Sequence, residues 1–378
     1  MAGIYIHIPF CRKACHYCNF HFSTQLKYLE ETIDGIVKEI GMPNDFIDTG
    51  APIDTIYFGG GTPSLLSKEL LMNILYALRK KFKVSDHAEL TIETNPDDIT
   101  AESLMMWSEA GFNRLSVGMQ SFNEEELQWM NRSHTAKQSI RCLEMIRDSA
   151  FRNYTVDLIT GSPYCTEEQL KQSLEMLSAL QVPHISSYAL TVEPGTALHH
   201  FVQHQKSPDV QQEHQARQLL LTSETLTKLG YEHYEISNFA MPGFRSNHNS
   251  NYWNGSPYFG FGPSAHSYDG KRTRRWNVAN NALYIKSISQ NQLPFEEEIL
   301  SPQQQYNEHI MIRLRTAEGI SIKQVSASFG VKKAEALMNQ LQPFIASKDV
   351  VEYEKECYRL SAQGRLLADG ISASLFEE

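Results

Sequence analysis

The chain has 378 residues, of which 41% are hydrophobic, and its 34 Lys and Arg residues against 44 Asp and Glu residues give a formal net charge of −10. This composition indicates a folded chain and argues against broad binding to nucleic acid or anionic membranes, because both require Lys and Arg against phosphate. No apolar run reaches the roughly 18 residues of a membrane span, and the first residues lack a charged leader with a cleavage site. We therefore expect a cytoplasmic protein without a nucleic-acid partner, and a peripheral contact with the membrane remains an alternative.

Residues 1–229 are expected to form a domain in which strands and helices alternate. Apolar alternation predicts strands at 4–8, 53–58, 89–93, 114–117, 155–159 and 184–190. Helical spacing predicts helices at 26–40, 70–82, 101–110, 124–130, 137–149 and 167–180. Six such units in series imply an α/β fold with a parallel sheet, and right-handed crossovers make an open or closed barrel the natural result.

The rest of the chain divides into two further parts. Residues 230–300 are rich in Asn, Tyr, Trp, His, Gly and Pro and show few periodic segments, so we expect a loop-rich connecting region folded over a ligand. Residues 301–378 predict helices followed by a two-stranded hairpin and a last helix, which resembles a winged-helix module. Because this part carries 9 Lys and Arg against 10 Asp and Glu, we expect it to pack or to cover a substrate rather than to read DNA.

The residues that could carry chemistry follow the predicted strands. Cys11, the turn at 59–62, Glu93, Gln120 and Asp157 all lie at or just after a strand end. Active sites of parallel sheets are built at the carboxyl ends of their strands. The motifs and the topology therefore predict one common site.

Three cysteines, Cys11, Cys15 and Cys18, lie in one loop after the first strand. In a reducing compartment such a cluster indicates a metal rather than disulfides. Zinc would need a fourth ligand, for which His7, His16 or His21 could serve. A [4Fe-4S] cluster held by three thiolates would keep one iron open, and the amino and carboxylate groups of a ligand such as S-adenosylmethionine could chelate it. The spacing, with Tyr17 before the last cysteine, resembles the signature of the radical S-adenosylmethionine superfamily.

The glycine run Gly59-Gly60-Gly61 lets a ligand approach the backbone closely, but it lacks the Gly-Lys-Ser/Thr of a nucleotide-binding P-loop. A plain tight turn is the alternative. Glu93 and Asp157 could accept hydrogen bonds from an ammonium or ribose group, or could equally be structural caps. Gln120 and Arg132 are similarly ambiguous when each is taken alone.

Several longer segments resemble the oxygen-independent coproporphyrinogen III oxidase family. They are 5–11 (YIHIPFC), 113–122 (NRLSVGMQSF), 156–159 (VDLI), 234–239 (YEISNF) and 258–262 (YFGFG), together with the glycine run. The resemblance implies an incomplete (β/α)6 barrel with a C-terminal helical domain. It implies that Cys11, Cys15 and Cys18 ligate the cluster. It also implies that Tyr5, Tyr17, Gly60, Gly61, Thr62 and Glu93 contact S-adenosylmethionine, in a pocket that Gln120, Arg132 and Asp157 complete.

Two departures from the oxidases favour the haem chaperone branch of that family. Phe20 stands where the oxidases have a further cysteine, and the signature strand begins almost at Met1, whereas the oxidases have a long preceding segment. The branch implies binding of haem and its transfer to an acceptor protein, with a membrane-associated respiratory enzyme as a candidate and a homodimer as an open alternative. The rival hypothesis is an enzyme that oxidatively decarboxylates the propionate side chains of coproporphyrinogen III, so retention of the radical chemistry is left open.

A last motif, His248-Asn-Ser-Asn-Tyr252-Trp253, matches a His-Asn-x-x-Tyr-Trp sequence that is associated with haem binding in this branch. A histidine can ligate haem iron, and the Tyr and Trp rings can lie against a flat porphyrin. Residues 230–300 would then cover the haem or substrate. The alternative is a histidine held by hydrogen bonds among aromatic residues at a domain interface.

Overall fold

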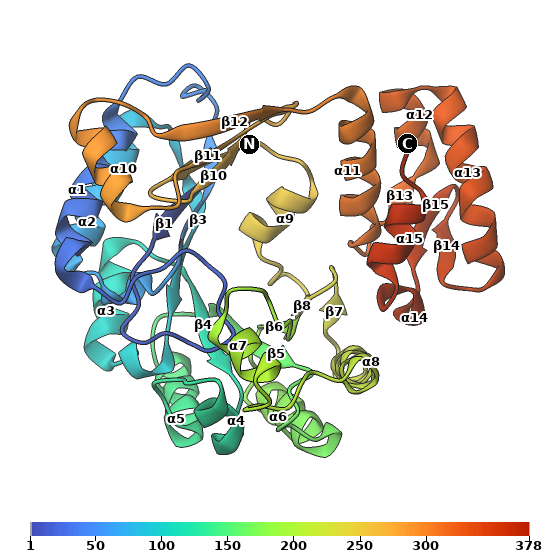
Figure 1. Cartoon of the computed structure of the whole chain (residues 1–378), viewed down its shortest axis with the longest axis horizontal. Coiled ribbons are helices and arrows are strands. Elements are labelled where there is room, and N and C mark those ends of the chain that lie inside the picture. The colour runs from blue at the N-terminus through green and yellow to red at the C-terminus, as the bar shows by residue number, and fades with distance from the viewer. Residues whose placement is uncertain (1, 378) are drawn as a thin grey trace.

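A computed structural model describes residues 2–377 and shows a curved sheet of 12 strands in the order β12-β11-β10-β9-β1-β2-β3-β4-β5-β6-β8-β7. Six parallel strands form its centre and confirm the predicted incomplete barrel (Figure 1). They are β1 (Ala2–Ile8), β2 (Ile53–Gly60), β3 (Val84–Thr94), β4 (Arg114–Gln120), β5 (Asn153–Thr160) and β6 (His184–Ala189).

Helices and short 3-10 turns follow these strands, and the long helices cover the outer face of the sheet. They are η1 (Leu26–Tyr28), α1 (Leu29–Gly41), η2 (Pro63–Leu65), α2 (Lys68–Lys81), η3 (Pro96–Asp98), α3 (Ala101–Ala110), α4 (Glu124–Trp129), α5 (Ala136–Arg147), α6 (Glu167–Ala179), α7 (Ala197–Gln203) and α8 (Gln212–Lys228). Thr100, Thr135 and Thr166 begin α3, α5 and α6 with capping boxes, in which side chains satisfy the first free backbone amides.

The central strands have a polar inner face and an apolar outer face, because alternate residues of a strand point to opposite sides. On β2, Ile56 and Phe58 belong to the hydrophobic core beneath the helices. Thr55 and Tyr57, which alternate with them, hydrogen-bond to His248 and Glu93. The barrel interior is therefore lined with polar side chains, and the core lies outside it.

Residues 230–300 contain more regular structure than the sequence predicts, in short elements joined by loops. They contribute β7 (Glu232–His233), β8 (Asn238–Ala240), α9 (Asn247–Trp253), β9 (Tyr258–Phe261), β10 (His266–Tyr268), β11 (Thr273–Asn277), α10 (Asn281–Ser289) and β12 (Phe295–Ile299). β9 pairs with β1, and β8 pairs with β6, so this region extends both edges of the sheet. Its strands are short and their partners lie far away in sequence, which hides them from local pattern analysis.

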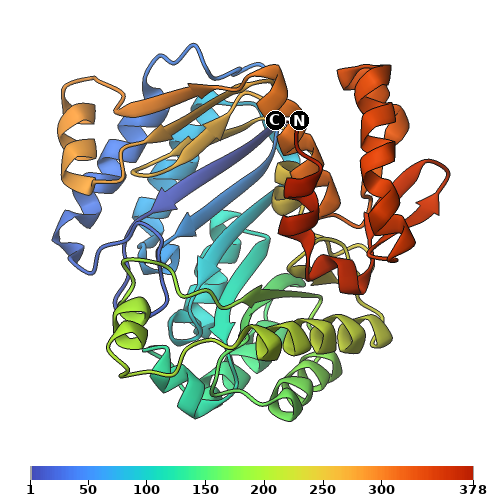
Figure 2. The same ribbon diagram turned by 45° about the vertical axis from the view of Figure 1, so that its right-hand side comes forward.

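The C-terminal part lies beside the barrel (Figure 2). It has its own hydrophobic core, which includes Ile310, Val325 and Leu337. It consists of α11 (Pro302–Leu314), β13 (Ile320–Ser321), α12 (Ile322–Phe329), α13 (Val331–Ala346), β14 (Val350–Glu354), β15 (Cys357–Leu360), α14 (Ala362–Arg365) and α15 (Ala368–Ser374). The three strands form a separate small sheet in the order β13-β15-β14. The helices and hairpin that the sequence predicts here are present.

None of the helices in residues 2–377 combines the length and the apolar character that crossing a membrane requires.

Candidate functional site

A cavity of about 430 Å³ opens at the carboxyl ends of the central strands. Eleven of the residues singled out from the sequence line it: Cys11, Cys15, Tyr17, Cys18, Gly60, Gly61, Thr62, Glu93, Gln120, Arg132 and Asp157. They come from loops or strand ends far apart in the chain, so the fold brings together what the motifs predict. We call this cavity and its lining the mouth of the barrel.

The loop of the three cysteines is fixed by its neighbours on both sides. Backbone amides of Gly61 and Thr62 donate to the carbonyl oxygens of Ile8 and Phe10 at 2.9 and 2.7 Å. A Cβ atom on Gly61 would lie 2.6 Å from the oxygen of Phe10, so only glycine allows this approach. On the other side, Asn131 donates to the oxygen of Ala14 at 2.7 Å.

Arg132 connects the cysteine loop to the strand ends. Its Nη1 donates to the Sγ of Cys15 at 3.2 Å, and its Nη2 donates to the Oδ1 of Asn95 at 2.6 Å and to the oxygen of Gly118 at 2.7 Å. A guanidinium suits this position because it offers several donors in a fixed plane. Its positive charge opposes the rise in the pKa of Cys11 and Cys18 that burial causes.

Glu93 lies deeper in the mouth and is held at both carboxylate oxygens. Tyr57 donates to its Oε1 at 2.8 Å, and the backbone amide of Gly60 donates to its Oε2 at 3.0 Å. Burial raises the pKa of Glu93 to about 7, and the hydrogen bonds from Tyr57 and Gly60 oppose that shift. A cationic donor in the mouth would favour the charged form of this carboxylate.

Asp157 is a second carboxylate in the mouth, and one of its oxygens is a hydrogen-bond acceptor that is unused within residues 2–377. Its Oδ2 accepts from Ser116 at 2.9 Å, whereas its Oδ1 is buried without a hydrogen-bond partner among the described residues. Burial also raises the pKa of Asp157. A buried acceptor without a partner is costly for a fold, so this oxygen indicates a place for a donor from a ligand.

Gln120 reaches the mouth through an unusual backbone conformation, because its φ is 65° at the end of β4. Such values are uncommon for residues other than glycine and concentrate at functional sites. Tyr5 does not line the cavity. Its ring packs against Tyr57 with centroids 6.1 Å apart, and its hydroxyl contacts the Nδ1 of His7 at 3.1 Å.

The His248 motif lies at the opposite end of the barrel, on α9. Only 2% of the surface of His248 is exposed, and its ring stacks on Tyr57 with centroids 4.9 Å apart. Its Nδ1 contacts the hydroxyl of Thr55 at 2.8 Å, and its Nε2 contacts the hydroxyl of Tyr252 at 2.9 Å. A Cβ atom on Gly3 would lie 2.9 Å from the hydroxyl of Thr55 and 3.5 Å from the His248 ring, so glycine leaves room for the inserted side chain. Burial lowers the pKa of His248 to about 3. We call this buried cluster around His248 the floor of the barrel.

Helix α9 is held at its start by Glu89, a buried residue of β3. Glu89 accepts from the backbone amides of Asn247 and His248 at 3.1 and 3.0 Å, and from the hydroxyl of Ser246 at 3.4 Å. A carboxylate at a helix N-terminus satisfies amides that have no partner within the helix. His248 is thereby fixed from its backbone as well as from its ring.

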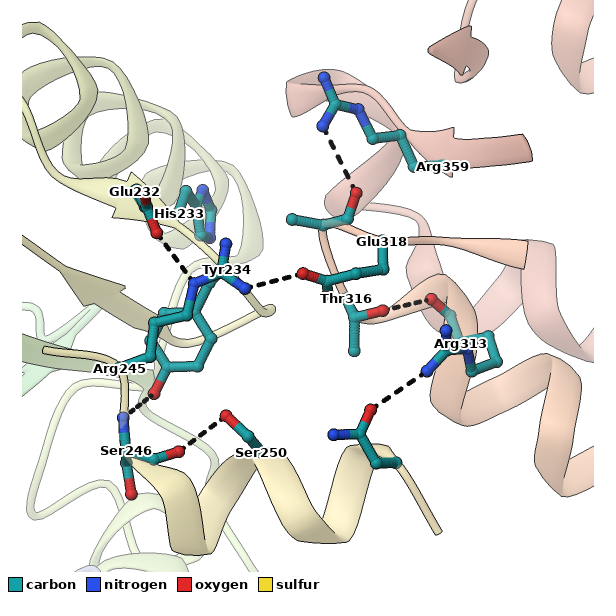
Figure 3. A network of polar contacts seen from close by, with 12 residues as sticks. Glu232, His233, Tyr234, Arg245, Ser246, Ser250, Arg313, Thr316, Glu318 and Arg359 are labelled. Carbon is teal, nitrogen blue, oxygen red and sulfur yellow. Dashed lines mark hydrogen bonds and ion pairs between the residues drawn. The ribbon is translucent and has the colours of Figure 1, made fainter. Parts of the chain in front are cut away.

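The C-terminal domain contacts the same region through polar groups (Figure 3). Arg245, just before α9, donates to Glu232 at 2.9 Å and to Glu318 of the C-terminal domain at 2.7 Å. Arg313 of α11 donates to Asn254, which follows α9, at 3.4 Å. Helix α9 therefore lies between the sheet and α11, with contacts to the C-terminal domain near both of its ends (Figure 1).

The motif analysis did not identify several residues that complete the mouth. Tyr57, Asn95, Ser116 and Tyr188 line the cavity. The strand period could have identified Tyr57 and Ser116, because they alternate with apolar residues on β2 and β4. Of the described residues that line the mouth, none comes from 230–300.

The donor set of the mouth fits an iron-sulfur cluster and a polar organic ligand. Cys11, Cys15 and Cys18 are free thiols, and burial raises the pKa of Cys11 to about 11, so iron would have to replace its proton. In residues 2–377 no group of three His, Cys, Asp or Glu side chains converges on the position of a single metal ion. A cube offers a different iron to each cysteine and needs no such convergence. The free oxygen of Asp157 and the carboxylate of Glu93 suit an ammonium or hydroxyl group.

Comparisons with known proteins agree with this reading of the fold. The model of the radical SAM superfamily, named for S-adenosylmethionine, matches residues 5–177, and the model of the HemN C-terminal domain matches residues 300–367. The solved structure of coproporphyrinogen III oxidase (HemN) from Escherichia coli, described as a radical SAM enzyme, superposes with a TM-score of 0.84. It covers 99% of this chain and 90% of that chain at 23% identity, which shows a shared fold.

The matched models show that the chain contains a radical SAM domain at residues 5–177 and a HemN C-terminal domain at residues 300–367, and its fold is that of HemN. Among curated proteins, Heme chaperone HemW of Bacillus subtilis is 34% identical over 100% of both chains. Heme chaperone HemW of Mycobacterium tuberculosis strain H37Rv is 30% identical over 99% of this chain and 94% of its own. The chain belongs to the HemW family.

Proposed function

We propose that this protein is a haem chaperone that holds an S-adenosylmethionine-chelated [4Fe-4S] cluster in the mouth of its barrel, binds haem and passes it to an acceptor protein. The observation that carries the proposal is the mouth itself, where three free cysteines, a glycine turn and two buried carboxylates surround one cavity. Similarity to the full length of proteins named Heme chaperone HemW supports the assignment of haem as cargo.

Different residues of the mouth would bind the cluster and S-adenosylmethionine. Cys11, Cys15 and Cys18 would ligate three irons, while Glu93 and Asp157 would accept hydrogen bonds from the ammonium and hydroxyl groups of S-adenosylmethionine. Tyr17, Gly60, Gly61, Thr62, Gln120 and Arg132 would complete this pocket, with Tyr5 packed behind it. When bound, the cluster and its ligand supply one-electron chemistry.

The His248 motif would contribute to haem binding only after a local change. Both ring nitrogens of His248 are hydrogen-bonded, so ligation of haem iron requires one of them, most simply the Nε2 next to Tyr252, to exchange its partner. The rings of Tyr252 and Trp253 would then be available to pack against the porphyrin.

One experiment tests the proposal against its rivals. Protein reconstituted without air is mixed separately with haem and with coproporphyrinogen III. We expect haem binding, seen as a shifted Soret band, and no formation of protoporphyrinogen IX. Conversion of coproporphyrinogen III would establish the oxidase alternative, and metal analysis that finds zinc without acid-labile sulfide would overturn the cluster.

The proposal extends to the acceptor and to the assembly state. We expect haem-loaded protein to transfer haem to a haem-depleted respiratory enzyme in membranes, measured as recovered absorbance in the washed membrane fraction. Haem that stays with the protein while free haem loads the same membranes would contradict this acceptor. Light scattering with and without the cluster would show whether the chain forms a homodimer.

A further inference from the structure

Tyr57 touches the mouth and the floor of the barrel at the same time. Its hydroxyl donates to Oε1 of Glu93 at 2.8 Å, and its ring stacks on His248 with centroids 4.9 Å apart and planes inclined by 23°. Tyr57 also lines the cavity. A single side chain therefore connects the carboxylate proposed to bind S-adenosylmethionine with the histidine of the haem motif.

The surroundings of Tyr57 make this contact sensitive to what occupies the mouth. The other oxygen of Glu93 accepts from the backbone amide of Gly60 at 3.0 Å, and a movement of the Tyr57 side chain leaves this bond in place. Oε1 is therefore the oxygen of Glu93 that can accept a hydrogen bond either from Tyr57 or from a ligand in the mouth. A cationic donor that binds Oε1 competes with the Tyr57 hydroxyl for the lone pairs of this oxygen, and this competition weakens the hydrogen bond from Tyr57.

The ring of Tyr57 also helps to hold His248 in place. Thr55, two residues earlier on the same face of β2, holds the Nδ1 of that histidine, and the Tyr57 ring covers its flat side. If the ring of Tyr57 moves, His248 loses stacking contacts, and its exchange from Tyr252 to another partner becomes easier. A ligand that weakens one contact of Tyr57 thereby favours the release of the other.

We propose that Tyr57 is a positioning residue that couples occupancy of the mouth to haem binding through His248, so that each ligand strengthens the binding of the other. This inference rests on the proposed function. Because thermodynamic coupling is reciprocal, haem must raise the affinity for S-adenosylmethionine by the same factor. We expect a factor of about five or more, the lower end of typical coupling between sites.

The test measures the haem dissociation constant of the reconstituted protein by Soret titration, with and without saturating S-adenosylmethionine. Tyr57→Phe keeps the ring and removes only the hydroxyl. We expect the wild type to bind haem about fivefold or more tightly when S-adenosylmethionine is present. Tyr57→Phe should bind haem as tightly without S-adenosylmethionine as the wild type does with it, and should show no further change.

Tyr258→Phe is the matched control, because it removes a phenolic hydroxyl from a ring whose centroid lies 4.7 Å from that of Tyr252 and leaves the bond between Tyr57 and Glu93 intact. This variant should retain the wild-type coupling. Equal haem affinity of the wild type with and without S-adenosylmethionine, or full coupling in Tyr57→Phe, would overturn the role of Tyr57 while the proposed function stands. Failure of the wild type to bind haem at all would overturn both.

Discussion

The two ends of the barrel interior use similar side chains in opposite ways. At the mouth, Asp157 has a buried oxygen without a partner among the described residues. At the floor, His248 has both ring nitrogens engaged, and Glu89 accepts three hydrogen bonds. The mouth therefore keeps capacity for a ligand, whereas the floor is satisfied by the protein itself.

Strand β3 shows this difference within four residues. Glu89 and Glu93 both point into the barrel, but Glu89 serves the first turn of α9, whereas Glu93 faces the cavity. A residue type alone does not separate a structural carboxylate from a binding one. The partners that the tertiary structure supplies make that distinction.

The largest expected effect concerns the ligands of the mouth. Cys11→Ala removes one of three thiolates, so we expect iron, acid-labile sulfide and the brown colour of anaerobically reconstituted protein to fall to background. Cys357→Ala, in the hairpin of the C-terminal domain, is the control and should retain the cluster. Full iron and sulfide in Cys11→Ala would show that the mouth does not hold the cluster in this way.

The floor should respond to loss of its central side chain through stability. His248→Ala leaves a cavity and removes the partners of Thr55 and Tyr252, so we expect the free energy of unfolding to fall by about 3 to 4 kcal/mol. Denaturant titration measures the change. His87→Ala, at an exposed position, should change it by less than about 0.5 kcal/mol. An effect of His248→Ala as small as this control would mean that the floor is not a packed structural unit.

The raised pKa of Glu93 predicts a dependence of stability on pH. Between its ordinary pKa of 4.5 and its native pKa of about 7, the native state holds a proton that the unfolded state has released. Its stabilising contribution is therefore complete below pH 4.5 and is lost as the pH rises through about 7. Glu93→Gln lacks this titration. Over that range we expect the wild type to lose about 2 kcal/mol more than the variant, measured by unfolding at each pH. Parallel curves for the two proteins would contradict a raised pKa.

The smallest expected effect separates the two glutamates of β3. Glu89→Gln places an amide donor against backbone donors at the start of α9, so we expect a loss of about 1 kcal/mol in the free energy of unfolding at neutral pH. Hydrogen exchange should also become faster at the amides of Asn247 and His248. Unchanged exchange at these amides would show that Glu89 does not hold the helix.

The sequence predicts the central fold well because its signal is local. The alternation of Ile56 and Phe58 with Thr55 and Tyr57 marks β2 without knowledge of its neighbours, and Thr100 marks the start of α3. The short strands of residues 230–300 give no such signal. β9, for example, is defined by its pairing with β1, more than 200 residues earlier, and pairing over that distance leaves no local pattern.

The candidate site shows the same division. The cysteine spacing, the glycine run and the strand-end position of Glu93 already predict the mouth, because motifs at the carboxyl ends of parallel strands must converge. The sequence does not single out Tyr57 as a site residue. It alternates with the apolar residues of β2, but a tyrosine in a strand is usually a packing residue. The motif around His248 also does not predict that this histidine packs against Tyr57.

The sequence by itself determined the order of the central strands and helices and most of the side chains that meet at the mouth, because periodicity and strand-end chemistry are properties of neighbouring residues. Only the tertiary structure decided that His248 is inserted into the floor of the barrel, that Glu89 holds its helix, and that Tyr57 lies between His248 and Glu93. The contacts of α9 with Thr55, Tyr57 and Glu89 join segments about 160 to 190 residues apart, and only the packing of α9 against the sheet brings them together.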